Sequence, residues 1–321
     1  MTAYRTSVRC APLYTARCYW TDARLLAAVR EIGQLRRPIG LCDSIRHGAI
    51  AACDSGFVVP VADNYRQEDM IMKGVILVGG LGTRLEPMTR VSNKHLLPIW
   101  RYPMVYYPLY TLVEAGIKDI LIVTGGNSPG DFLELLHDGR EFGLQHLYYT
   151  YQAAPRGIAD ALRLVNHFIN QDPFVVMLGD NIVNGSIKAY VDKFRHTPSG
   201  AHLLLAEVSD PHRFGVPALD EDGRITQIIE KPADPPTSYA VTGIYMYDHQ
   251  IWEILPGLQV SDRGQYEITD VNNAYLERGM LHHDVLPFEW TDAGTPEGLC
   301  HATDLARHSH FLRDLPLDDC N

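Results

Sequence analysis

The pattern of apolar and polar positions changes near Met72. Beyond this residue, short continuous apolar runs alternate with segments in which apolar residues recur every three or four positions. The continuous runs are rich in β-branched residues, which is typical of strands buried on both faces. They lie at residues 73–78, 119–124 and 174–178.

The segments between these runs predict helices. Each has apolar residues at helical spacing and a Pro or Gly at its start, which is a common first residue of a helix. The predicted helices cover residues 103–115, 129–137 and 157–169. Because strands and helices alternate, we expect an α/β fold with a mainly parallel sheet covered on both faces.

The rest of the chain is less regular. After Gly200 the pattern predicts strands at 203–208, 224–230 and 240–247 and helices at 248–255 and 266–277. Before Met72, a lysine-free segment contains one amphipathic stretch, residues 21–37, that predicts a helix. We therefore expect an N-terminal extension of unassigned structure (1–71), one main domain (72–306) and a short C-terminal tail (307–321).

Composition narrows the class of protein. With 321 residues, 46% of them hydrophobic, the chain can bury a sizeable core, so most of it is expected to be folded. A net charge of −11 disfavours nucleic acid and anionic membranes as partners. No run approaches the roughly 20 apolar residues of a membrane span, and no signal peptide precedes the domain, so we expect a cytoplasmic protein.

The six cysteines include no C-x-x-C pair. Ordinary reduced thiols are expected, although the four cysteines before Asp54 leave a metal knuckle or a disulfide open.

A glycine-rich turn follows the first predicted strand, with the sequence Gly79-Gly80-Leu81-Gly82-Thr83-Arg84. Glycines at the end of a strand let backbone N–H groups approach a phosphate chain closely. The turn is not a dinucleotide fingerprint, because the third glycine would fall on Leu85. It is not a P-loop either, because no G-K-[ST] follows. The turn therefore predicts a phosphate site of another kind, and a purely connecting role is the alternative.

Charged residues near other strand ends extend this hypothesis. Arg84 and Lys94 supply cations that can stabilise a departing pyrophosphate. Asp180 and Asp292 each follow an apolar strand pattern, and two such carboxylates brought together would form a Mg²⁺ site completed by phosphate and water. Taken singly, each aspartate is equally typical of a turn.

A third strand end carries Glu230 and Lys231, a pair suited to sugar hydroxyls and a sugar phosphate. Arg263, in a predicted turn, offers a further cation. Taken alone, these residues are also compatible with an ordinary salt-bridged strand end and a loop arginine.

The order and spacing of these motifs closely resemble the bacterial glucose-1-phosphate thymidylyltransferase family over about residues 72–306. The resemblance rests on several short segments in the same order. They are residues 73–85, Lys94 to Pro98, Met104 to Leu109, Leu178 to Asn181, Glu230-Lys231-Pro232, Tyr239 to Gly243 and Glu267 to Asp270. The resemblance implies a Rossmann-like α/β nucleotidyltransferase fold with a mainly parallel or mixed sheet.

The resemblance also implies roles for individual residues. The nucleotide phosphates would lie against Gly79, Gly80, Gly82, Thr83 and Asp180. Arg84 and Lys94 would hold the pyrophosphate portion, and with Lys231 they are the expected catalytic residues. Gln152 and Gly157 would contact the pyrimidine edge, and Asp180 and Asp292 would bind Mg²⁺. Lys231 and Arg263 would hold the sugar phosphate, against a sugar pocket formed by Gly215, Glu230, Val241 and Gly243.

The implied reaction transfers a nucleoside monophosphate from an NTP, expected to be dTTP, to a hexose 1-phosphate, expected to be glucose 1-phosphate. The products are an NDP-sugar and pyrophosphate. No general base is required, because a sugar phosphate is already ionised at neutral pH. The same chemistry with UTP or another NTP or sugar is the first alternative, and a catalytically silent nucleotide-sugar-binding protein is the second. A sugar transferase is disfavoured, because Asp180-Asn181-Ile182 is not a D-x-D motif. Assembly into a homo-oligomer is left open.

Some positions depart from the family pattern. Arg156 stands where the family usually has an acidic residue, Asn184 near a usual Tyr or Phe, and Gln265 in place of Glu. Arg156 and Asp160 lie beside the expected base site and bear on base preference. The chain ends at Asn321, sooner than members with an allosteric nucleotide site, so feedback inhibition should not be assumed. Residues 1–71 are either an added small domain or, as we favour, sequence read in frame ahead of a start at Met72.

Overall fold

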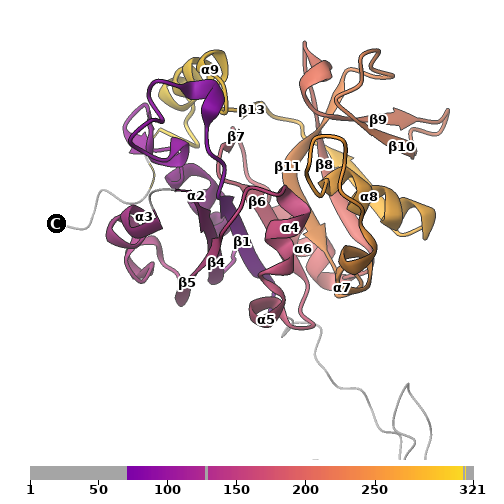
Figure 1. The fold of residues 1–321 in the computed structure, drawn as a ribbon, viewed down its shortest axis with the longest axis horizontal. Helices are drawn as coiled ribbons and strands as arrows, with labels where there is room; N and C mark the ends of the chain where they lie inside the picture. Colours follow the sequence, from indigo (N-terminus) through magenta and orange to yellow (C-terminus); the bar gives the residue numbers. More distant parts are fainter. Residues whose placement is uncertain (1–70, 127–128, 314, 316–321) are drawn as a thin grey trace, which may run out of the picture. The chain divides into compact units, whose positions relative to one another are not determined.

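The computed structural model describes residues 71–126, 129–313 and 315, and the predicted helix at 21–37 lies outside them. A seven-stranded sheet runs through this part of the chain, in the order β12-β8-β11-β6-β1-β4-β5 (Figure 1). Its strands are β1 (Lys73–Val78), β4 (Asp119–Gly125), β5 (His146–Gln152), β6 (Phe174–Leu178), β8 (Ala201–Glu207), β11 (Tyr239–Tyr247) and β12 (Leu281–Val285).

The sheet is mixed. β6, β1, β4 and β5 run parallel to one another, and β12 runs parallel to β8. β11 is antiparallel to both of its neighbours, β6 and β8. The expected α/β fold with a mainly parallel or mixed sheet is therefore confirmed.

Successive residues of a buried strand point to opposite faces of the sheet, so the apolar strands present side chains on both faces. Helices cover both of these faces. In β1, Ile76 belongs to one core cluster, which the helices α2 (Tyr106–Glu114), α3 (Pro129–Leu136) and α6 (Lys188–His196) help to form. Val75 belongs to the cluster on the other face, which contains residues of α4 (Ile158–Arg163), α7 (Ile251–Ile254) and α8 (Ile268–Glu277). A third cluster packs α9 (Pro296–His308) against residues 99–107.

One predicted helix is divided, and one predicted domain boundary falls inside a helix. The helix expected over 157–169 is two helices, α4 and α5 (Asn166–Ile169), because Leu164 and Val165 donate to the carbonyl groups three residues earlier and tighten the chain there. The C-terminal helix α9 continues to His308, beyond the expected domain end at residue 306. Leu312 and Leu315 are then buried against the third cluster.

Two short strand pairs extend the fold at the edge where β1 and β6 end. β7 (Asn181–Val183) pairs antiparallel with β13 (Trp290–Asp292), and β9 (Gly215–Leu219) pairs antiparallel with β10 (Ile225–Glu230). The β9–β10 hairpin projects from the sheet on the side of β11 and α8 (Figure 1). These pairs carry side chains from distant parts of the sequence to the carboxyl ends of β1 and β6. No helix in the described part of the chain is long and apolar enough to span a membrane.

Candidate active site

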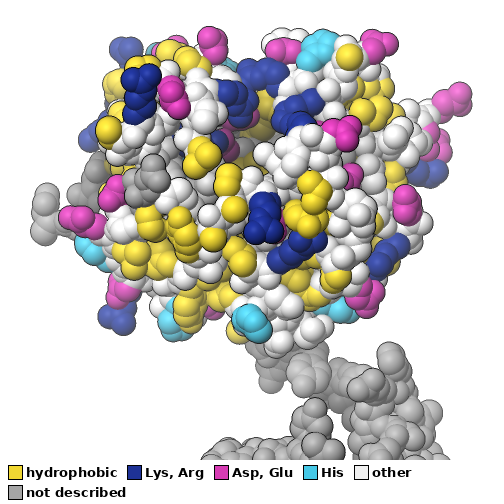
Figure 2. All heavy atoms as spheres, viewed as in Figure 1, with side chains coloured by type: hydrophobic (Ala, Val, Ile, Leu, Met, Phe, Trp, Pro, Cys, Tyr) yellow, Lys and Arg dark blue, Asp and Glu magenta, His cyan; other side chains and the backbone are white. Residues whose placement is uncertain are grey.

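A cavity of about 350 Å³ opens at the carboxyl ends of β1 and β6. Ligands bind at this edge in open α/β sheets. The space-filling view shows several Lys and Arg side chains around a hollow on this face (Figure 2). Most of the residues proposed from the sequence line this cavity. They are Gly79, Gly80, Arg84, Lys94, Gln152, Gly157, Asp180, Gly215, Glu230, Lys231, Val241, Gly243, Arg263 and Asp292.

Gly82 and Thr83 belong to the glycine turn but are not among the lining residues. Gly82 instead shapes the turn, since its φ of +67° lies in the left-handed region. A Cβ at this position would also approach Thr89 Cγ2 to 2.9 Å and Lys94 Cβ to 3.0 Å. The contacts of Gly82 are thus with the turn and with Lys94 rather than with the cavity.

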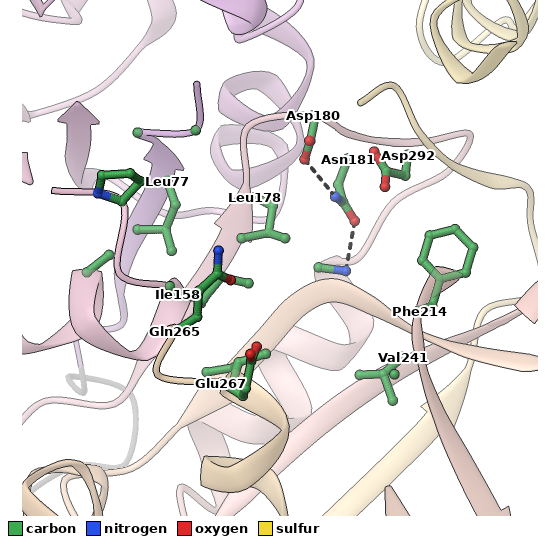
Figure 3. A pocket seen from close by; sticks show the side chains of 18 of the residues that line it. Leu77, Ile158, Leu178, Asp180, Asn181, Phe214, Val241, Gln265, Glu267 and Asp292 are labelled. Atoms are coloured by element: carbon green, nitrogen blue, oxygen red, sulfur yellow. Dashed lines mark hydrogen bonds between the residues drawn. The ribbon is translucent and has the colours of Figure 1, made fainter. Parts of the chain in front are cut away.

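The two candidate metal ligands meet through the pairing of β7 with β13. In this register Asn181 is the partner of Asp292, so the preceding Asp180 lies beside it. The backbone N–H of Ala293 donates to the Asp180 carbonyl oxygen at 2.8 Å. Figure 3 shows Asp180 and Asp292 at the same end of the pocket. The strand pairing therefore juxtaposes carboxylates that are 112 positions apart in the sequence.

Gly294 marks the centre of this group. A Cβ built on Gly294 would lie 2.7 Å from Asp292 Oδ1, 3.1 Å from Asp180 Oδ2 and 3.3 Å from an Arg84 guanidinium nitrogen. Lys94 Nζ completes the group through an ion pair with Asp180 Oδ2. Two carboxylates and the Arg84 guanidinium thus lie around Gly294, and Lys94 joins them through Asp180.

The two carboxylates differ in their electrostatics. Burial raises the pKa of Asp180. The charges of Lys94 and His95 and the hydrogen bonds from Lys94 and Asn181 lower this pKa by more than burial raises it, so the net shift is downward. The pKa of Asp292 is raised by burial and by the negative charge of Asp180, against the weaker effects of Lys94, Gly294 and Arg84. Asp292 therefore carries a charge that its surroundings do not fully compensate.

These residues fit a hard divalent cation. Two buried carboxylates supply oxygen ligands, and a divalent cation would relieve the repulsion that raises the pKa of Asp292. The described residues contain no cluster of three or more His, Cys, Asp or Glu side chains able to form a complete protein site. The donor set suits Mg²⁺, which retains water molecules and binds substrate phosphates.

Gln152 and Gly157 also line the cavity. Gln152 ends β5, and Gly157 precedes α4 with a φ of +104°. Gly157 lies against the loop that carries Arg263, since a Cβ built on it would lie only 2.4 Å from the Tyr266 carbonyl oxygen. The N–H of Tyr266 in turn donates to the Arg156 carbonyl oxygen at 2.7 Å. The expected base site and the expected sugar-phosphate site are thus joined by backbone contacts.

The expected sugar-phosphate residues surround Glu230. This carboxylate accepts from Thr269 Oγ1 at 2.7 Å and from Arg263 at 2.9 Å, and Lys231 Nζ lies 3.4 Å away. Arg263 also pairs with Glu267 at 2.8 Å. Lys231 has a φ of +47°, an uncommon conformation for a residue with a side chain and one often found at functional sites. Both cations therefore face the cavity while held by carboxylates.

The cavity contains further side chains that sequence reasoning did not single out. Asn181 is fully buried, and its Oδ1 accepts from the Gly243 N–H at 2.8 Å and from Trp290 Nε1 at 2.7 Å (Figure 3). His95 is buried, and burial together with Lys94 lowers its pKa to about 3, so it is neutral at pH 7. Arg213 adds a cation to the lining of the cavity. Asn181 and His95 both belong to sequence segments that carry the family resemblance, and their position in these segments could have identified them.

The departures noted in the sequence lie in different places. Gln265 lines the cavity, beside Glu267 (Figure 3). Arg156 is exposed and is not among the lining residues, and neither is Asn184. Of the three, only Gln265 is placed to contact a ligand in this cavity.

A family profile described as Nucleotidyl transferase matches residues 73–309. The chain belongs to the nucleotidyl transferase family. Curated relatives named glucose-1-phosphate thymidylyltransferase support this. The relative from Mycolicibacterium smegmatis is 42% identical over 239 residues, covering 74% of this chain and 82% of the relative. The relative from Neisseria meningitidis is 41% identical over 247 residues, covering 76% and 85%.

Solved members of the family share the fold. A Bacillus anthracis protein assigned as a glucose-1-phosphate thymidylyltransferase, in complex with sucrose, matches with a TM-score of 0.72 and 46% identity, covering 77% of this chain and 99% of its own. A UDP-glucose pyrophosphorylase complexed with UDP-glucose matches with a TM-score of 0.65 and 25% identity, covering 73% and 98%. The resemblance inferred from the sequence motifs is therefore confirmed.

Proposed function

We propose that this chain is a glucose-1-phosphate thymidylyltransferase, which transfers a thymidylyl group from dTTP to glucose 1-phosphate and releases pyrophosphate. One observation carries the chemical part of the proposal. Arg84, Asp180 and Asp292 converge around Gly294, Lys94 pairs with Asp180, and Gln152 lines the same cavity. The names of the curated relatives support the same reaction.

In the proposed reaction, a phosphate oxygen of the sugar attacks the α-phosphorus of the nucleotide. A new P–O bond forms as the bond to pyrophosphate breaks, and the electron pair leaves with pyrophosphate. Two anions must approach each other, so positioning and charge screening carry most of the catalysis. Lys231 and Arg263 hold the sugar phosphate, and Arg84 and Lys94 hold the departing pyrophosphate. Asp180 and Asp292 would hold Mg²⁺, which would supply charge neutralisation of the phosphates.

Two features of the site bear on this mechanism. Arg263 is paired with Glu230 and Glu267, so a sugar phosphate has to compete for its guanidinium. The exchange favours a dianionic phosphate over a neutral sugar. Lys231 has one longer contact with Glu230, at 3.4 Å, and is the more available of the two cations.

The test is pyrophosphate release from glucose 1-phosphate and Mg²⁺ with each of dTTP, UTP, CTP, ATP and GTP. We expect dTTP to lead, with UTP as the closest competitor, because these two nucleotides differ by a methyl group and a 2′-hydroxyl, a difference of about 1–3 kcal/mol. Asp180→Asn and Asp292→Asn should each reduce turnover at least about a hundredfold while the fold survives. No pyrophosphate release with any nucleotide would refute the proposed function. Leading activity with ATP or GTP would refute the base assignment alone.

A further inference from the structure

Two protein neighbours fix the orientation of the Gln152 side-chain amide. Its Nε2 lies 3.2 Å from the Gly157 carbonyl oxygen and 3.0 Å from Asp160 Oδ2. A carbonyl and a carboxylate can only accept hydrogen bonds, so the atom that faces both has to be the NH₂ group. Both donors of Gln152 are therefore used within the protein.

The remaining polar atom of this side chain is Oε1, which lies against the glycine turn. A Cβ built on Gly79 would be 3.3 Å from Gln152 Oε1, and both residues line the cavity. Gln152 thus offers the cavity an acceptor and no donor. Uracil and thymine present a donor, N3–H, whereas cytosine presents a lone pair at N3.

Asp160 is held in place to impose this orientation. It lies in the first turn of α4, is not a lining residue of the cavity, and its Oδ1 is 3.7 Å from Arg163. Arg163 is anchored in turn by the Leu255 carbonyl oxygen at 2.8 Å and by the ring of Tyr266, whose centroid is 4.0 Å from the guanidinium carbon. The carboxylate therefore acts on a ligand only through Gln152.

We infer that Asp160 is a positioning residue for base selection: it fixes Gln152 with Oε1 toward the cavity, so that the site accepts a base with an N3–H group and rejects cytosine. This inference rests on the proposed function for the location of the base. It also refines the expected role of Gln152, because the donor to a thymine carbonyl has to come from another group. A rotated Gln152 amide would place its oxygen against two acceptors, which is unfavourable because both hydrogen bonds would be lost.

The test compares dTTP with dCTP, which share sugar and phosphates and differ only in the base. Affinity is measured by isothermal titration calorimetry without sugar phosphate, and kcat/KM is measured by pyrophosphate release. Wild-type protein should prefer dTTP at least about a hundredfold in both. Asp160→Ala should reduce the preference for dTTP over dCTP about tenfold. The change should come from weaker dTTP binding, with the affinity for dCTP unchanged or increased. Asp160→Asn, which keeps an acceptor oxygen, should retain most of the preference.

A purely structural role of Asp160 would give a different result. If Asp160→Ala weakens dTTP and dCTP equally, Asp160 only supports the start of α4 and the inference is wrong. Equal affinities of the wild-type protein for the two nucleotides would overturn it as well. A failure of the proposed function would show itself as absent pyrophosphate release, while the calorimetric ratio would still report on Asp160.

Discussion

Gly294→Ala adds one methyl group at the point where the candidate metal ligands and cations meet. The added Cβ would lie 2.7 Å from Asp292 Oδ1, whereas ordinary contacts begin near 3.4 Å. Relief therefore needs a displacement of about 0.7 Å, in a carboxylate that also accepts the Gly294 N–H at 2.7 Å. The nearby Asp180 oxygen and Arg84, at 3.1 and 3.3 Å, limit movement in their direction.

A shift of this size is large for magnesium chemistry. Mg²⁺ requires near-ideal octahedral geometry at about 2.0–2.1 Å, and a misplacement of about 1 Å at a reacting centre costs about a hundredfold in rate. We expect Gly294→Ala to lower kcat/KM for pyrophosphate release about a hundredfold, equivalent to about 2.7 kcal/mol. The loss should be partly reversed by high Mg²⁺ if the displaced ligand weakens metal binding.

Gly257→Ala is the matched control, because nothing lies within 4 Å of a Cβ at that position. It should keep wild-type kinetics. Thermal unfolding of both variants would show whether either substitution damages the fold. If Gly294→Ala folds and retains kcat/KM within about threefold at limiting Mg²⁺, the carboxylates do not work at the position proposed here.

Three further outcomes follow from other parts of the structure. Lys231→Ala should raise KM for glucose 1-phosphate more than KM for dTTP. The reverse pattern would mean that the assignments of the two cation clusters to sugar phosphate and nucleotide are swapped. Burial lowers the pKa of His202, against the charge of Asp284, so the unfolded chain binds a proton more readily than the folded one. Stability should fall as the pH drops below about 6.5, and His202→Gln should flatten that part of the profile in urea unfolding at several pH values. Asp248 accepts from the Gly200 N–H at 2.7 Å and from the Tyr275 hydroxyl at 2.9 Å, so Asp248→Ala should lower the free energy of unfolding by about 2–4 kcal/mol without changing the nucleotide preference.

Two strands that lie in the middle of the sheet have the bounds that the sequence predicts. β1 and β6 have the predicted bounds, because a continuous apolar run can only be satisfied in the middle of the sheet. The edge strands β5 and β12 were not predicted. β5 exposes Tyr148 and Tyr151, and β12 has the sequence Leu-His-His-Asp-Val, so neither shows a clear apolar run. The strand order could not be predicted from the sequence either, because it depends on contacts between distant segments.

The site shows the same division between local and long-range information. The Gly79 turn and Lys94 predict a phosphate site from neighbouring residues alone, and that role remains a prediction. The meeting of Asp180 with Asp292 depends on the pairing of β7 with β13, two short strands that local periodicity cannot align. The strand patterns suggested a shared Mg²⁺ site only on the condition that the two aspartates meet, and the resemblance to a family was needed to pair them. The contact of Asp160 with Gln152 was likewise invisible, since it depends on the bend between β5 and α4.

The ion pair between Lys94 and Asp180 joins the proposed phosphate-binding cation to a proposed Mg²⁺ ligand. In the proposed complex Asp180 turns to Mg²⁺ and Lys94 to phosphate, so each loses the other as a partner. If only one exchange took place, a buried charge would be left without its counterpart, which is costly in a buried site. The two exchanges should therefore occur together, and the nucleotide should bind as its magnesium complex. Calorimetry should show weak binding of Mg²⁺ alone and of dTTP with EDTA, and tight binding of the two combined. Tight binding of Mg²⁺ without nucleotide would contradict this coupling, because Asp180 would then have to leave Lys94 without any phosphate to replace it.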